Sequence, residues 1–151
     1  MGWKFYDPKT APDVFSIVWC KWPYRGAKLE PSDEARPVLV LDVRDHIYDP
    51  TGEMFADVTV AYGTGAENIE TPDVHRDFVV TEREFRALGL HKPTIFQLDL
   101  GNRKRLPWGE KYFVPNSYVA QQNIICGKLS DSQRRLVLTC FNIRGLRFPL
   151  P

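Results

Sequence analysis

Histidines and cysteines, the side chains that most often carry catalysis or bind metals, are few here and lie far apart. No histidine is paired with Asp, Glu or Cys at the spacing of metal ligands, and we expect all three to be ordinary surface or loop residues: His46, His75 and His91. The three cysteines form neither a zinc pattern nor a disulfide framework: Cys20, Cys126 and Cys140. The sequence therefore predicts no metal and no cofactor.

Arg36 and Thr64 are the residues whose chemistry best suits a phosphate group. Arg36 opens an apolar segment after a polar loop, and Thr64 stands between two glycines where another strand should end. A guanidinium is permanently charged and offers two donors that match a phosphate or phosphorane. A threonine hydroxyl can donate to or accept from a nearby oxygen. If the two strands are neighbours, the pair forms a phosphate site; a structural role for each residue is the alternative.

A short basic segment is the best candidate for contact with an RNA backbone. It comprises Arg103, Lys104 and Arg105, with Trp108 and Lys111 close by. Basic side chains neutralise phosphates, and an aromatic ring can stack on a base. The alternative is a solvated hairpin tip in which Trp108 packs inside. The arginines near the C-terminus suggest a solvated face, or a dimer or partner surface: Arg134, Arg135, Arg144 and Arg147.

The net charge of +1 conceals an uneven distribution. Residues 1–100 contain 11 Lys and Arg against 17 Asp and Glu, whereas residues 101–151 contain 9 against 2. The basic part either neutralises the acidic part across one surface or forms a face that binds a polyanion.

The composition fits one domain over residues 1–151, with 1–13 as an N-terminal extension. Hydrophobic residues make up 43% of the chain, which excludes general disorder. No stretch approaches the roughly 18 apolar residues of a membrane span, and the N-terminus lacks the pattern of a secretory signal. We therefore expect a cytoplasmic protein with no membrane contact.

Short apolar runs between turn residues predict a mainly β (α+β) fold. The expected strands cover residues 14–22, 38–44, 55–62, 77–80, 94–100 and 112–114, with a mobile loop over 24–35. Thr81 and Glu84 predict a short inserted helix that ends at Gly89, and Ser130 and Gln133 predict a C-terminal helix. This pattern favours a small β-barrel with the helices packed outside.

Several segments, in order, resemble the MazF/PemK family of toxin ribonucleases. The matching segments are 19–23, 36–41, 58–65, 88–94 and 127–130, within a resemblance that covers roughly residues 14–143. The resemblance implies an SH3-like barrel that acts as a homodimer, cuts single-stranded RNA without a metal, and is neutralised by a cognate antitoxin protein. It also implies that Arg36 and Thr64 are catalytic, that Arg36 stabilises charge on the phosphorus, and that the products carry 2′,3′-cyclic phosphate and 5′-OH ends.

The chain departs from the family pattern at Gly63 and Gly65, which are expected to loosen the site, and in extra segments at its N-terminus and at 67–73 and 108–125. A non-catalytic RNA- or protein-binding barrel of the same fold is therefore the alternative function. A gyrase-poisoning relative is disfavoured, since such proteins act through a C-terminal Trp-Gly-Ile and this chain ends Phe148-Pro149-Leu150-Pro151.

Overall fold

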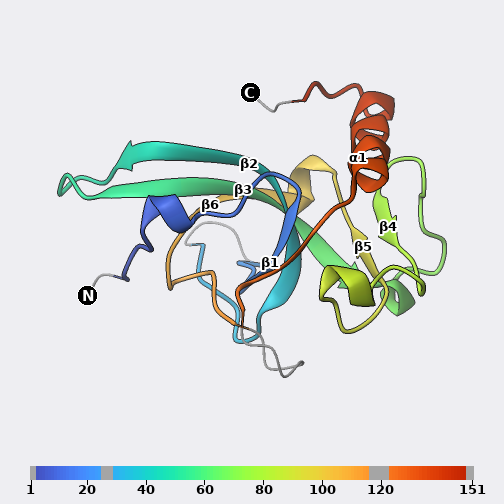
Figure 1. Cartoon of the computed structure of the whole chain (residues 1–151), viewed down its shortest axis with the longest axis horizontal. Coiled ribbons are helices and arrows are strands. Elements are labelled where there is room, and N and C mark those ends of the chain that lie inside the picture. The colour runs from blue at the N-terminus through green and yellow to red at the C-terminus, as the bar shows by residue number, and fades with distance from the viewer. Residues whose placement is uncertain (1–2, 25–28, 116–122, 149–151) are drawn as a thin grey trace.

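The structure is a computed structural model that describes residues 3–24, 29–115 and 123–148. Within them the chain is mainly β with one α-helix, α1 (Asp131–Ile143), as predicted (Figure 1). The strands are β1 (Ser16–Cys20), β2 (Arg36–Tyr48), β3 (Met54–Gly65), β4 (Phe78–Val80), β5 (Thr94–Phe96), β6 (Arg103–Pro107) and β7 (Ile125–Lys128). Single turns of 3-10 helix are η1 (Pro8–Thr10), η2 (Ala66–Asn68), η3 (Arg86–Leu88) and η4 (Leu100–Asn102).

The strands form one antiparallel sheet that curls into a half-barrel. Its order is β4-β5-β3-β2-β1-β7, and β6 pairs with β3 as well. Because β2 takes one edge of β3, the other edge is shared: β6 pairs with residues 57–61 and β5 with residues 63–65. The change of partner separates the end of β3, which carries Thr64, from the part that pairs with β6.

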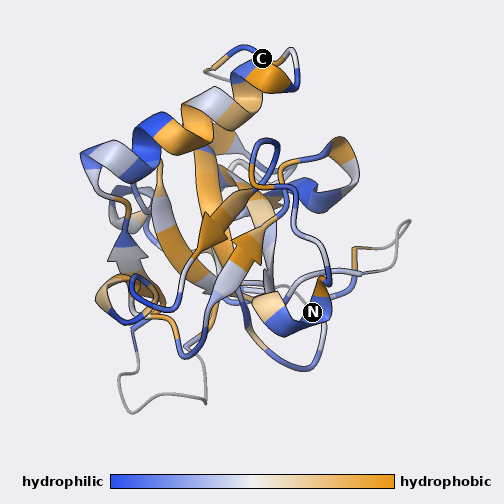
Figure 2. Ribbon diagram, turned by 90° about the vertical axis from the view of Figure 1, so that its right-hand side faces the viewer, coloured by the Kyte–Doolittle hydropathy of each residue, from blue (hydrophilic) through white to orange (hydrophobic). Residues whose placement is uncertain are grey.

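β2 is the central strand that its sequence predicts. Its side chains alternate between two apolar clusters, with Leu39 and Leu41 in one, and Val38 and Val40 in the other. A strand buried on both faces needs apolar residues at successive positions. Figure 2 shows these apolar strands beneath the helix α1.

The β2–β3 hairpin is longer than predicted and projects from the rest of the sheet (Figure 1). A turn closes the hairpin, and the Asp49 carboxylate accepts hydrogen bonds from the backbone N–H groups of Thr51 and Glu53, each at 2.9 Å. The N-terminal segment packs against this hairpin, where the ring of Phe5 stacks on that of Phe55 at 4.5 Å.

The C-terminal helix starts at the predicted cap. The Ser130 hydroxyl accepts from the Gln133 backbone N–H at 3.3 Å, and the Gln133 side chain accepts from the Ser130 N–H at 2.8 Å. The apolar sequence positions 136, 137, 140 and 143 recur at helical spacing and predict a buried stripe, but the buried face differs in part. Residues at positions 133, 137, 140 and 141 face the sheet, whereas Leu136 and Ile143 are 55% and 49% exposed.

The predicted inserted helix is reduced to turns and η3. The Glu84 carboxylate accepts from the Thr81 hydroxyl at 2.8 Å, and Gly89 ends the segment with φ of 75°. Phe85 and Leu88 are buried. A segment this short forms few helical hydrogen bonds, so it does not offset the cost of nucleating an α-helix.

The strands differ from the prediction in three further places. The strand predicted over 94–100 ends at Phe96, and Leu100 is 79% exposed in η4. The segment 112–114 makes a single bridge, between Phe113 and Cys20, in place of a strand. β7, which pairs with β1, was not predicted, because its side chains are partly exposed and carry no alternating pattern.

Candidate functional site

Arg36 and Thr64 lie at the paired ends of β2 and β3. The pair Val38 and Tyr62 ends the register between the two strands, and Arg36 and Thr64 each lie two residues beyond that pair on their own strand. Positions two apart share a face of a strand, so both side chains lie on the face of Val38 and Tyr62. The Arg36 side chain is 38% exposed and Thr64 is half-buried. The two groups therefore share one face, and the guanidinium is open to solvent.

Close packing holds the segment of β3 that carries Thr64. A Cβ added at Gly63 would lie 2.6 Å from the Pro37 carbonyl oxygen, and one at Gly65 would lie 2.5 Å from the Glu67 carboxylate. Thr64 itself pairs with Ile95 of β5. The two glycines therefore allow neighbouring groups to approach the backbone closely.

Tyr62 lies near both predicted site residues, Arg36 and Thr64. Its hydroxyl lies 2.9 Å from that of Tyr24, and Arg36 and Thr64 are both near enough to influence its pKa. Burial, with the Tyr24 hydroxyl as a further cause, raises the pKa of Tyr62 to about 12, although Arg36 and Thr64 oppose this. The phenol therefore stays protonated at neutral pH and is able to donate a hydrogen bond.

The Thr64 hydroxyl has a hydrogen-bond partner in the turn that follows β3. It accepts from the Asn68 side-chain amide at 3.1 Å. Asn68 belongs to η2, which is tied to the segment before β5 because the Ala66 N–H donates to the Pro93 carbonyl at 3.0 Å. The hydroxyl is thus oriented by a side chain of this turn.

Charged groups surround the guanidinium. Arg36 lies 3.7 Å from the exposed Glu34 carboxylate, a distance at which the ion pair is loose and solvated. The Lys92 ammonium and the Glu67 carboxylate, which like Arg36 influence the pKa of His91, are 2.5 Å apart. This ion pair lowers the pKa of Glu67 and keeps it ionised near the site.

His91, expected to be an ordinary loop residue, lies within electrostatic reach of Arg36. Burial, then the Lys92 and Arg36 cations, lower the pKa of the half-buried imidazole, and the Glu67 carboxylate opposes the shift. The ring is therefore neutral at pH 7 and able to accept a proton. The sequence carries no signal for this placement, because it depends on how the segment before β5 packs beside β3.

The basic segment at residues 103–105 lies within strand β6 and is not a hairpin tip. Successive side chains of a strand point to opposite faces, which separates Lys104 from Arg103 and Arg105. Lys104 lies on the face of the site, with its ammonium 5.7 Å from the centre of the Trp22 ring. Arg103 lies close enough to Arg144 and Asp99 to interact with both, whereas Arg105 interacts with Asp57.

Trp108 is a packing residue here. It is 3% exposed, and its indole N–H donates to the Thr10 hydroxyl at 3.0 Å. Its ring contacts those of Tyr6 and Phe113 at 5.2 and 5.0 Å. A ring enclosed in this way has no open face for a nucleobase.

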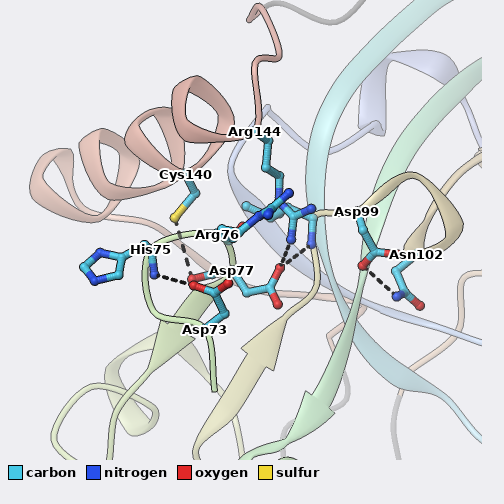
Figure 3. A network of polar contacts seen from close by, with 9 residues as sticks. Asp73, His75, Arg76, Asp77, Asp99, Asn102, Cys140 and Arg144 are labelled. Carbon is cyan, nitrogen blue, oxygen red and sulfur yellow. Dashed lines mark hydrogen bonds and ion pairs between the residues drawn. The ribbon is translucent and has the colours of Figure 1, made fainter. Parts of the chain in front are cut away.

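A second polar cluster lies at the C-terminal end of α1 (Figure 3). The Asp77 carboxylate accepts from the Arg144 guanidinium at 2.6 Å and from the Leu98 backbone N–H at 3.1 Å. Arg144 also donates to the Arg76 carbonyl at 2.7 Å. The paired side chains are only 12% and 15% exposed. This cluster joins the helix to the segments beside β4 and β5. It has a structural role and shares no residue with the Arg36 site.

Neither a metal site nor a reactive thiol emerges from the described residues. Among residues 3–24, 29–115 and 123–148, no group of three or more His, Cys, Asp or Glu side chains could hold a metal ion. Burial raises the pKa of all three cysteine thiols, that of Cys126 to about 12. None of the helices in this part of the chain is long and apolar enough to cross a membrane.

The fold and site define a mainly β half-barrel with one helix and a solvent-open cluster of Arg, Thr and Tyr side chains. No family model matches this chain, nor does any curated protein or solved structure. A function for this chain must therefore be argued from the chemistry of the cluster. A guanidinium, a phenol and an oriented hydroxyl on one face can together hold an anion such as a phosphodiester.

Proposed function

We propose that this chain is a metal-independent endoribonuclease that cuts single-stranded RNA, with the curled sheet serving as an SH3-like barrel of the MazF/PemK type. The observation that supports it is the position of Arg36 and Thr64 on one face of two paired strand ends, with the Tyr62 phenol interacting with both. The products would carry 2′,3′-cyclic phosphate and 5′-OH ends.

In this proposal Arg36 stabilises the charge that develops on the phosphorus. The 2′-oxygen of the RNA forms a new bond to phosphorus while the bond to the 5′-oxygen breaks, and the phosphorane between these states carries extra negative charge. Donors already aimed at such charge usually provide the largest share of catalysis. The Arg36 guanidinium would donate hydrogen bonds to two oxygens of the phosphorane, and the protonated Tyr62 hydroxyl would donate to the phosphorane as well.

Thr64 would position the nucleotide that reacts. Its hydroxyl is oriented by Asn68, so it can hold a phosphate oxygen or the 2′-OH in a defined place. A nucleotide held in this way has already lost much of its freedom of movement, so less entropy is lost on reaching the transition state.

Proton transfer is assigned to His91. A guanidinium, whose pKa exceeds about 12, neither accepts nor releases a proton readily at neutral pH. The neutral imidazole beside it would take the proton of the 2′-OH, and the departing 5′-oxygen would take one from solvent. Burial and the neighbouring cations keep the imidazole in the form that accepts.

The biological setting proposed here follows from the same resemblance. The protein would act in the cytoplasm as the toxin of a type II toxin–antitoxin pair, as a homodimer, and a cognate antitoxin protein would neutralise it. Lys104 is the residue of the basic segment that shares the face of the site, so it is the one assigned to the RNA backbone.

Cleavage of a labelled single-stranded RNA in the presence of EDTA tests the proposal. We expect the wild type to cleave the RNA and the variants Arg36→Ala and Thr64→Val not to. Thermal unfolding of each variant should remain cooperative, which would show that both variants fold. Arg44→Ala is a matched control, because Arg44 lies on the same strand with a side chain 40% exposed. Thr59→Val is the corresponding control on β3. Both controls should cut at the wild-type rate.

Analysis of the fragment ends completes the test. The upstream fragment should end in a cyclic phosphate, and the downstream fragment should accept a phosphate from a kinase without prior dephosphorylation. An Arg36→Ala enzyme with normal kinetics would remove the mechanism. RNA that is bound but never cut would support the non-catalytic barrel instead.

A further inference from the structure

Tyr24 is a large aromatic residue that is exposed yet held in place. It follows β1 and is 53% exposed. Its ring meets that of Tyr62 edge-on with the centroids 5.6 Å apart, and the two hydroxyls are 2.9 Å apart. Two contacts to one partner restrict the ring while most of its surface remains in water. The mechanism described above does not use this side chain.

The ring of Tyr24 ends a row of aromatic side chains that crosses the sheet. Trp22 is 3% exposed, and its ring lies 5.2 Å from that of Tyr62. At the far end of the row, the Lys104 ammonium lies 5.7 Å from the Trp22 ring. Aromatic rings beside a cation are the usual surface for single-stranded nucleic acid, since bases stack on the rings and the cation tracks the backbone.

The row runs directly beside the Arg36 site. Tyr62 contacts Tyr24 through its ring and hydroxyl, and the same hydroxyl interacts with Thr64 and Arg36. A phosphate held by Arg36 would therefore lie one side chain away from the Tyr24 ring. That is the neighbourhood in which a base of an adjoining nucleotide must be placed.

We propose that Tyr24 is a binding platform for an unpaired RNA base next to the phosphate held by Arg36. The inference rests on the proposed ribonuclease function and names the contact that selects single-stranded substrate. Bases within a duplex already stack on one another, so they present no free face to the ring. Tyr62 holds the Tyr24 ring, Trp22 packs against Tyr62, and Lys104 would contact the backbone farther along.

The test measures binding separately from cleavage. The probe is a fluorescein-labelled, mixed-sequence oligonucleotide of 2′-O-methyl ribonucleotides, which cannot be cut because its 2′-oxygen is blocked. Fluorescence anisotropy would compare the wild type with Tyr24→Ala, Tyr24→Phe and Tyr48→Ala. Tyr48 is 62% exposed at the far end of β2 and serves as the control.

Tyr24→Ala should weaken binding about 5- to 150-fold, the range expected when one base loses its aromatic stacking partner. Tyr24→Phe keeps the ring and should bind within about threefold of the wild type, and Tyr48→Ala should bind like the wild type. An abasic oligonucleotide of equal length should bind the wild type and Tyr24→Ala equally. Addition of the complementary strand should abolish binding.

The outcomes separate this inference from the proposed function. A wild type that cuts RNA while Tyr24→Ala binds the probe normally would overturn the platform alone. A loss of affinity that persists with the abasic probe would also overturn it, because the effect would not arise from a base. A wild type that neither binds the probe nor cuts RNA would overturn the function and, with it, the platform.

Discussion

The Gly63 backbone lies so close to the Pro37 carbonyl that a Cβ at Gly63 would approach its oxygen to 2.6 Å. Pro37 follows Arg36, and Gly63 precedes Thr64. The close approach of the two backbones therefore sets the separation between the candidate catalytic side chains. On the other edge of β3, Phe96 pairs with Gly63 and would meet the same Cβ at 2.8 Å.

Gly63→Ala should destabilise the protein by about 1–3 kcal/mol, the usual cost of overpacking a tightly packed position. Urea unfolding followed by tryptophan fluorescence measures this change, and RNA cleavage should fall because the strand ends move apart. Gly65→Ala is the control, since its Cβ would meet only the end of the flexible Glu67 side chain. Equal stability of Gly63→Ala and the wild type would show that the backbones separate easily.

Arg36→Lys should reduce cleavage about 10²- to 10³-fold, although it keeps the positive charge. A lysine ammonium is a point charge and does not offer the paired donors of a guanidinium. The loss of one well-placed donor to a developing oxyanion has an effect of this size. The measurement is kcat/KM on single-stranded RNA, with Arg44→Lys as the control. Wild-type activity in Arg36→Lys would mean that charge alone suffices.

Arg144→Ala should destabilise the fold by about 3–5 kcal/mol, because it leaves the Asp77 carboxylate largely buried with its cation removed. Urea unfolding measures the difference. Lys128→Ala is the control, since Lys128 and Asp13 form a pair at 3.1 Å with side chains 48% and 79% exposed. Such a pair contributes little in water. Similar effects of the two variants would contradict the structural role of the Asp77–Arg144 pair.

His91 should make the fold less stable as the pH falls below its unperturbed pKa of 6.5. The folded chain holds the pKa of this imidazole below that value, so the unfolded chain binds the proton more readily. The associated stability is complete above pH 6.5 and declines as the pH falls toward the folded pKa. The groups that face His91 are Arg36, Glu67 and Lys92, with the ring of Trp19 at 6.0 Å.

Urea midpoints between pH 7.5 and pH 5 test this expectation. His91→Gln should flatten the acid side of the curve, and His75→Gln should not, because His75 is exposed and lies away from this cluster. If cleavage uses the imidazole as a base, the wild-type rate should fall over the same pH range. If the urea midpoints of His91→Gln and the wild type depend on pH in the same way, protonation of His91 does not destabilise the fold.

The elements predicted correctly are those whose evidence is local. The apolar run 38–41 identifies a strand buried on both faces, and the pair Ser130 and Gln133 marks the start of α1. Elements that depend on distant partners were misassigned. β7 exists because it pairs with β1, and the segment 112–114 finds only one bridge to Cys20.

By itself, the sequence determined the residue types, the turn positions and the alternation along each strand, because these depend on neighbours in the chain. It therefore indicated Arg36 and Thr64 as strand-end residues. Only the tertiary structure decided which side chains join them. Strand pairing and close packing act between segments far apart in the chain, and they brought Tyr24, Tyr62 and His91 to the site while they buried Trp108 and separated Arg103 from Lys104.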